Sequence, residues 1–342
     1  MPAPSALTVR HSVMGWLRRP APLQRRFMAM GTFVTATLIV EPRGRVAADQ
    51  VLGEIENGLL AFGRDAWAWG DGLLANFNRR LASGERAAIP PSLRPLFERA
   101  WAVHRLSGGL FEPRIASLVR LWGFDDVART RDAPPDSGEI DALFAALRGA
   151  PDFDGGTHYG PARGIGWDFG GIAKGYIVDR LLDLLHRRGY RNVSLDAGGN
   201  LAVRGLRNDR PWRIGIRDPR SPHAPRLLAT LDASDEAVIT HGDDQRYFEF
   251  DRRRYSHLLD PRSGWPAQGL RSLTVVHRDA SIADAAGGAL FVAGAAGWRR
   301  LAARMKIDQV LVLTDRDELL ATEALAARLR ASDAETRLRA VA

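Results

Sequence analysis

The sequence has no cysteine among its 342 residues, and it has only two lysines, Lys174 and Lys306. The absence of cysteine excludes disulfide bonds, iron–sulfur clusters, thiolate zinc sites and a lipid-anchored cysteine. Arginine therefore supplies nearly all of the 48 basic side chains. Because arginine serves wherever a generic cation is sufficient, we expect Lys174 to lie where a compact ammonium group is needed.

The first 27 residues also lack the apolar run that a signal peptide or a transmembrane helix requires. They contain five arginines and end near Pro20 and Pro22. We therefore expect a disordered or loosely attached N-terminal arm over residues 1–27, one domain over 28–330 and a C-terminal tail over 331–342. By this absence alone, the protein is expected to work in the cytoplasm.

The composition is that of a globular protein with a basic surface. Its length and its 45% content of hydrophobic residues are sufficient for one large domain or two ordinary ones. The net charge is +8, but the arginines are spread along the chain and form no cluster interleaved with aromatic residues. Such a distribution indicates a solvated surface, so we expect no nucleic-acid partner.

The order of predicted elements favours an α+β fold with mixed, largely antiparallel sheets and flanking helices. Helical periodicity predicts helices over residues 46–61, 93–106 and 140–147, and an exposed loop over 130–136. A further amphipathic helix ends before Gly189, and another begins at Asp284. Strands are predicted over residues 33–40, 193–195, 201–203, 212–216, 227–231, 237–240, 247–250, 273–276 and 309–314.

One segment, residues 167–179, is typical of a phosphate-binding site. Gly170-Gly171 lets the backbone approach a ligand closely, and the following helix presents unpaired N–H groups beside Lys174. The segment is not a P-loop, because Lys174 precedes its glycine and Tyr176 replaces the magnesium-binding hydroxyl. It is also not the dinucleotide fingerprint GxGxxG. The alternative is a glycine turn that only leads into a packed helix.

Two later segments carry titratable side chains. Residues 240–242, Thr-His-Gly, are followed by His257 and Asp260 beside a proline turn, which would hold an imidazole and a carboxylate against a substrate. The alternative is that Asp260 only caps its own turn. Asp284 precedes an Ala/Gly-rich helix, where a carboxylate either caps the helix or binds magnesium that bridges phosphates.

In this order and spacing, these segments resemble the ApbE family, flavin transferases that use FAD to attach FMN covalently to a target protein. The resemblance extends from Met30 to the helix that follows Asp284. It includes Asn78, the Gly-Gly-Leu-Phe-Glu-Pro run of residues 108–113, the Leu-Trp-Gly-Phe run of 121–124, and residues 168–179, 193–199, 216–219, 256–264 and 283–284. An ordered set of this kind is far more specific than any one motif.

The resemblance implies the family's own α+β fold, with a T-fold-like architecture, and assigns roles to named residues. It implies FAD contacts at Met30, Trp69, Leu110, Phe111, Glu112, Asp168, Lys174, Thr240, His257 and Leu258. It places a metal ion at the carbonyl of Gly171, the carboxylate of Asp284 and the position of Gly288. The catalytic residues would then be Lys174, His257 and Asp284.

Three positions depart from the family pattern. Glu112 stands where the family usually has aspartate, and His241 replaces the serine of a Thr-Ser-Gly element. Gly288 stands where the family has a threonine metal ligand, so this position offers no side-chain oxygen.

The activity that the resemblance implies is Mg²⁺-dependent transfer of FMN from FAD onto a Ser or Thr hydroxyl, with release of AMP. The acceptor would be a flavoprotein subunit of a respiratory or redox complex, and the compartment would be periplasmic or associated with the inner membrane. Two alternatives remain: hydrolysis of FAD to FMN and AMP at the same site, or FAD binding without catalysis, which the glycine at position 288 motivates. The oligomeric state is left open.

Overall fold

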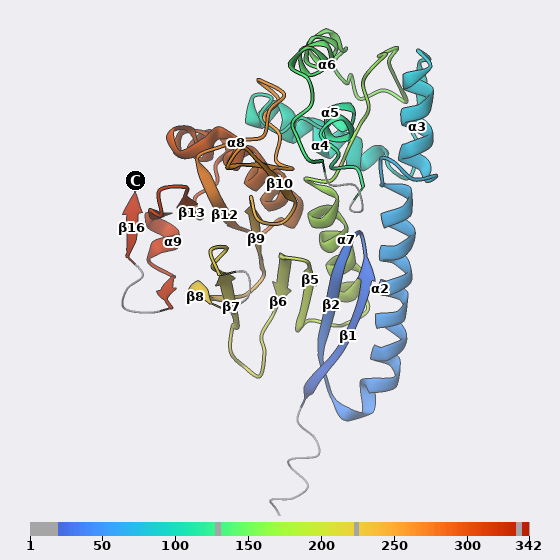
Figure 1. Cartoon of the computed structure of the whole chain (residues 1–342). Helices are drawn as coiled ribbons and strands as arrows, with labels where there is room; N and C mark the ends of the chain where they lie inside the picture. Colours follow the sequence, from blue (N-terminus) through green and yellow to red (C-terminus); the bar gives the residue numbers. More distant parts are fainter. Residues whose placement is uncertain (1–19, 127–130, 222–225, 333–336, 342) are drawn as a thin grey trace, which may run out of the picture.

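The computed structural model describes residues 20–126, 131–221, 226–332 and 337–341, and its centre is a nine-stranded sheet (Figure 1). The strand order is β1-β2-β5-β6-β9-β12-β13-β14-β16, and every pair is antiparallel except β14 with β16. The strands are β1 (Ala21–Ala29), β2 (Thr32–Val40), β5 (Val193–Ala197), β6 (Asn200–Arg204), β9 (Glu236–Gly242), β12 (Leu270–His277), β13 (Val310–Thr314), β14 (Leu319–Thr322) and β16 (Leu338–Val341). The predicted α+β class with largely antiparallel sheets is confirmed.

Both faces of this sheet are covered, which explains why its central strands are apolar at nearly every position. Successive side chains point to opposite faces. Val275 packs into the core beneath the helices, whereas its neighbour Val276 packs into a second core on the other face. On the helical face lie α2 (Arg45–Asp65), α7 (Ala173–Arg187) and α8 (Ala280–Met305), and the other face is covered by β7 (Trp212–Arg217), β8 (Leu227–Ala233) and β15 (Arg330–Ala331).

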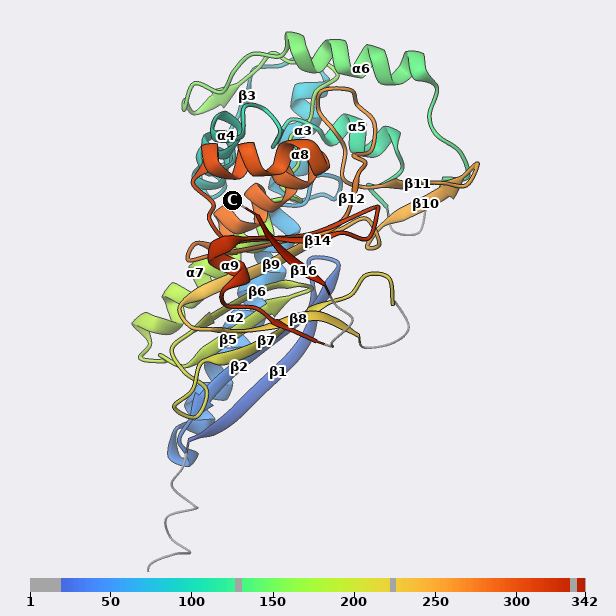
Figure 2. The same ribbon diagram turned by 90° about the vertical axis from the view of Figure 1, so that its left-hand side faces the viewer.

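Shorter helices gather at one end of the sheet, as both views show (Figures 1 and 2). They are α3 (Leu73–Ala82), α4 (Arg94–Ser107), α5 (Ala116–Leu121) and α6 (Ser137–Gly149), with the two-stranded pairs β3 (Ala87–Ala88) with β4 (His158–Tyr159) and β10 (Tyr247–Phe250) with β11 (Arg253–Ser256). The remaining elements are η1 (Pro42–Gly44) and α9 (Glu323–Ala326). α4 packs against α8, so this end of the molecule is joined to the helical layer.

Most predicted elements are confirmed, but both predicted chain ends are wrong at their boundaries. The expected arm over residues 1–27 overlaps β1, which pairs along its whole length with β2, and residues 1–19 lie outside the described residues. The expected tail over 331–342 contains β16, which pairs with β14. Both errors have the same cause. β1 and β16 are edge strands, and the polar residues of an edge strand cannot be distinguished from those of a loop by sequence alone.

Helix α8 begins four residues earlier than predicted, and Asp284 is not its cap. The side chain of Asp279 caps the helix by accepting a hydrogen bond from Ile282 N at 2.8 Å. Asp179 of α7 accepts two more, from the backbone N–H groups of Ala280 and Ser281 at 3.0 and 2.8 Å. Because the first turn is already capped, Asp284 is available for another purpose.

Helix α8 is, among the described residues, the one helix long and apolar enough to span a membrane by length and composition. Most of it is buried in the core, and it kinks at Gly294, where the backbone adopts φ 69° and ψ −178°. Its apolar character is therefore explained by its position between the sheet and the other helices.

The crossing of α7 and α8 depends on the absence of a side chain at Gly175. A Cβ atom there would lie 2.2 Å from the carbonyl oxygen of Ala280 and 2.9 Å from Asp284 Cβ. We expect Gly175→Ala to lower the free energy of unfolding by about 1–3 kcal/mol, because the two helices must separate. Urea denaturation measures this change.

Gly58→Ala in α2 is the matched control. The Cβ atom of an alanine at position 58 would meet only Leu181 Cδ2, at 3.9 Å, which is an ordinary contact. Alanine is the better helix former, so this variant is expected to keep or slightly raise stability. Equal losses of stability in the two variants would contradict the close helix crossing.

Candidate functional site

The glycine-containing segment before α7 is held in place by groups from distant parts of the chain. Asn78 of α3 donates to the carbonyl of Trp167 and accepts from its N–H, both at 2.8 Å. Asp168 N donates to the carbonyl of Pro113 at 2.8 Å. A Cβ atom at Gly171 would lie 3.3 Å from the ring of Phe111. The predicted 108–113 and 168–174 segments are therefore neighbours.

Asp168 carries the first carboxylate of the site. Its Oδ1 accepts a hydrogen bond from Gly170 N at 2.9 Å, which closes the turn before α7. Burial raises the pKa of Asp168, while this hydrogen bond and the positive charges of Lys174 and Arg246 act in the opposite direction. Asp168 thus lies within electrostatic reach of two cations, one of which is the lysine singled out by the sequence.

A backbone carbonyl holds His257 in place. Its ring Nδ1 lies 3.2 Å from the carbonyl oxygen of Arg246, and its own N–H donates to the same oxygen at 3.0 Å. Burial is the main cause that lowers the pKa of His257 to about 3. The hydrogen bond to the Arg246 carbonyl acts in the opposite direction, and the charges of Arg246, Lys174 and His241 act in the same direction as burial. The ring is therefore neutral at pH 7, and with Nδ1 donating to the carbonyl, Nε2 keeps a lone pair that accepts protons.

This shift predicts how stability depends on pH. The unfolded chain protonates a histidine near pH 6.5, whereas His257 in the folded protein takes up its proton only near pH 3. Between these two pH values His257 therefore lowers the free energy of unfolding as the pH falls, by up to about 1.4 kcal/mol per pH unit. In urea titrations of the metal-free protein from pH 7 to 4, His257→Gln is expected to lose stability less steeply than the wild type. Parallel curves would refute the burial of a neutral ring.

Asp284 is fully buried, and half of its carboxylate has no partner. Oδ2 accepts a hydrogen bond from Gly175 N at 3.0 Å, but Oδ1 has no hydrogen-bond partner within the described residues. Facing Oδ1 at 3.7 Å is Nε2 of His241, which also lacks a partner there. Burial lowers the pKa of His241, while the charge of Asp284 raises it. An unpaired buried carboxylate oxygen is costly, so this position fits a cation.

The other two predicted metal positions lie near Asp284 along the chain of these elements. Gly171 is in the turn that precedes α7, two residues before its first residue, and Gly288 is one turn after Asp284 on α8. Within the described part of the chain, no group of three or more His, Cys, Asp or Glu side chains could hold a metal. A bound ion would therefore complete its coordination with backbone carbonyls, water or phosphate oxygens.

Several predicted site residues have protein partners. Glu112 forms a two-point contact with Arg114, at 2.9 and 2.8 Å, and its side chain is 5% exposed. The hydroxyl of Thr240 lies 2.8 Å from that of Thr274. The Oδ1 atom of Asp260 accepts from Arg262 N at 2.8 Å, which agrees with the turn-capping alternative. Contacts of Glu112 and Thr240 with FAD stay predictions.

Four apolar members of the predicted FAD site lie at the margin of the core, whereas Phe111 is buried within it. Met30 occupies the β1–β2 turn with φ 52°, and its Cγ would be 3.0 Å from a Cβ at Gly63. Trp69, Leu110 and Leu258 are partly buried against the main core. Their FAD contacts also stay predictions.

Two residues near the centre of the site were not among the predicted site residues. Arg246 contributes charge to Asp168 and a carbonyl to His257, and burial lowers its own pKa. Nothing in the sequence distinguishes it from the other arginines. His241 was noted only as a departure from the family pattern, although its imidazole reaches the buried carboxylate.

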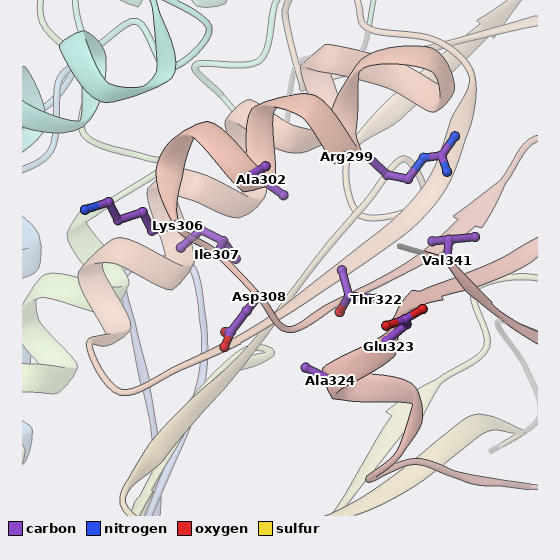
Figure 3. A pocket seen from close by; sticks show the side chains of 10 residues that line it. Arg299, Ala302, Lys306, Ile307, Asp308, Thr322, Glu323, Ala324 and Val341 are labelled. Carbon is purple, nitrogen blue, oxygen red and sulfur yellow. The ribbon is translucent and has the colours of Figure 1, made fainter.

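A separate hollow of about 550 Å³ lies between the end of α8 and the C-terminal elements (Figure 3). It is lined by Arg299, Ala302, Ala303, Lys306, Ile307, Asp308, Thr322, Glu323, Ala324 and Val341. None of these belongs to the predicted site. The residues around Lys174 and Asp284, rather than this hollow, therefore define the candidate site.

Comparison with known proteins shows the family. The model of the ApbE family matches residues 30–311, which include all of the predicted site residues. The chain belongs to the ApbE family.

The curated relatives carry the name FAD:protein FMN transferase. This ApbE protein is 35% identical over 274 residues to the one from Rhodobacter capsulatus, a match that covers 78% of the chain but only 51% of the relative. It is 31% identical over 250 residues to the one from Vibrio cholerae, with 72% of each protein covered. The chain therefore spans about half the length of the first relative and nearly three quarters of the second.

Solved structures confirm the ApbE fold. The ApbE protein of Thermotoga maritima superposes with a TM-score of 0.80 at 26% identity, covering 91% of this chain and 100% of the other. The flavin transferase ApbE of Vibrio cholerae superposes with a TM-score of 0.78 at 27% identity, covering 90% and 99%.

Proposed function

We propose that this protein transfers FMN from FAD onto a Ser or Thr hydroxyl of an acceptor flavoprotein, a subunit of a respiratory or redox complex, and releases AMP. The observation that carries the proposal is the buried Oδ1 of Asp284 at the crossing of α7 and α8, which has no hydrogen-bond partner in the part of the chain that the structure describes. Lys174 lies in the first turn of α7, and the curated relatives bear the name of this activity.

The phosphates of FAD are the groups that this site is best suited to bind. Lys174 in the first turn of α7 supplies a full positive charge. The N–H groups of Ala173 and Gly175, which the sequence predicted to be unpaired, donate instead to the carbonyl of Phe169 and to Oδ2 of Asp284. A divalent ion, Mg²⁺ in the family pattern, would be held by Asp284 with the carbonyl of Gly171 and would neutralise charge on the phosphates. Transfer of this kind depends chiefly on positioning and charge stabilisation.

His257 is assigned to the acceptor hydroxyl. Its Nε2 takes the hydroxyl proton as the acceptor oxygen bonds to the phosphorus on the FMN side. The bond from that phosphorus to the bridging oxygen then breaks, and AMP leaves with the bridging oxygen. Because the ring is neutral at pH 7, no prior deprotonation of His257 is needed.

One incubation distinguishes this proposal from its two alternatives. The full chain is mixed with FAD, MgCl₂ and a flavoprotein acceptor, and the products are separated on a denaturing gel and by chromatography. Covalently fluorescent acceptor and an equal amount of AMP are expected. Free FMN without labelled acceptor would identify a hydrolase. FAD that stays bound and unchanged would identify a binding protein.

A further inference from the structure

We propose that the imidazole of His241 is a metal ligand beside Asp284, and that it makes the site select a borderline first-row ion such as Co²⁺ or Zn²⁺ over Mg²⁺. The inference deepens the proposed function and rests on it, because it concerns the metal ion of the same site. It is carried by the structure around His241, a position at which this chain departs from the family pattern.

Two buried polar atoms face each other without forming a hydrogen bond. Nε2 of His241 and Oδ1 of Asp284 are 3.7 Å apart, and neither has a partner within the described residues. This separation exceeds hydrogen-bond length. It is shorter than twice the bond length of about 2.1 Å that nitrogen and carboxylate ligands make to zinc, so one ion can contact both atoms.

The position of His241 in the sheet directs its side chain toward Asp284. His241 lies on β9 directly opposite Leu273 of β12, and cross-strand partners project from the same face of a sheet. Leu273 is fully buried in the core that lies under the helices. The imidazole therefore projects from a central strand toward α8. A strand holds the side chain more firmly than a loop would.

The glycines of α8 make room for the ring. A Cβ atom at Gly287 would lie 2.4 Å from Cδ2 and 2.7 Å from Nε2 of His241, so any side chain there would displace the imidazole. At Gly288 a Cβ atom would lie 4.0 Å from Cε1 of the same ring. The imidazole thus provides a donor atom next to the position where this chain has lost a threonine oxygen.

The ligand types decide which ion is preferred. Carboxylate, carbonyl and water oxygens suit Mg²⁺, whereas an imidazole nitrogen suits Co²⁺, Ni²⁺ and Zn²⁺. Exchanging a hydroxyl oxygen for an imidazole nitrogen therefore shifts the selectivity of the site without changing its charge. Asp284 stays the anionic ligand in either case.

The test measures binding of CoCl₂ and MgCl₂ to the metal-free full chain by calorimetry, with Co²⁺ absorption as a second signal. We expect the wild type to bind Co²⁺ at least tenfold more tightly than Mg²⁺. His241→Ser should weaken Co²⁺ binding by about 10–100-fold, the range known even for groups that only support a metal ligand. The matched control is His158→Ser, which removes an exposed histidine and should change nothing.

A double variant restores the family pattern. His241→Ser with Gly288→Thr is expected to bind Mg²⁺ more tightly than the wild type and to lose the Co²⁺ absorption bands. Wild-type affinity for Mg²⁺ equal to or above that for Co²⁺ would overturn the inference, and this measurement needs no substitution. If FMN is transferred with Mg²⁺ and the site shows no preference for Co²⁺, the proposed function stands and the metal inference fails. If the site selects Co²⁺ but no FMN is transferred, the metal inference stands and the proposed function fails.

Discussion

Asp284→Asn is expected to reduce FMN transfer by at least about 10²–10³-fold, the loss typical when one charge-stabilising group is removed. The amide oxygen can still accept the hydrogen bond from Gly175 N, so the crossing of α7 and α8 is preserved. What is lost is the negative charge at Oδ1, which has no partner within the described residues. The effect should therefore fall on metal binding and turnover rather than on folding.

Stability provides the second measurement for this variant. Removing a buried, unpaired charge should leave the free energy of unfolding of the metal-free protein unchanged or raise it. Asp183→Asn, an exposed acid on α7, is the control for both measurements. Full transfer activity in Asp284→Asn would refute the assignment of Asp284 to the metal, and Asp284→Ala should also be inactive.

Lys174→Arg is expected to reduce transfer by about 10²-fold even though the charge is retained. Lys174 influences Asp168, His241 and His257 together, as the causes of their pKa shifts show. A planar guanidinium at the mouth of α7 would be too large to replace a compact ammonium among these groups. The loss is expected in kcat, because the positioning of the phosphates is disturbed.

The chain offers a matched control for this substitution. Lys306, its second lysine, is exposed at the end of α8 and away from the site, and Lys306→Arg should leave transfer unchanged. Steady-state rates at saturating FAD, with labelled acceptor as the product, compare the three proteins. Wild-type rates in Lys174→Arg would show that any cation is sufficient at position 174.

Much of the fold could be predicted because its signals are local. Alternating and continuous apolar patterns identify the strands around Val275, and Gly108 and Gly189 end helices through left-handed backbone conformations, with φ 67° and 87°. The chain ends were wrong for a physical reason. The sequence of β1 has exposed residues at alternate positions, and only its pairing with β2 makes it part of the sheet.

The candidate site, too, could be predicted from the sequence only in part. The glycine turn before Lys174, the histidine at 257 and the carboxylate at 284 were recognisable from residue types, order and spacing, and the family match over residues 30–311 confirms the family that they indicated. The sequence could not decide whether Asp284 was a cap or a ligand. Both need the same carboxylate near the start of a helix.

The sequence by itself therefore determined the family, the α+β class and the segments that carry chemistry. Only the tertiary structure showed that Asp279 and Asp179 cap α8 and that Oδ1 of Asp284 has no hydrogen-bond partner among the residues described. The contact between Asp284 and Gly175 joins residues 109 positions apart, and a strand from a third region places His241 opposite them. The distances between these three residues are set by the packing of the helices on the sheet. A local pattern of residues does not contain this information.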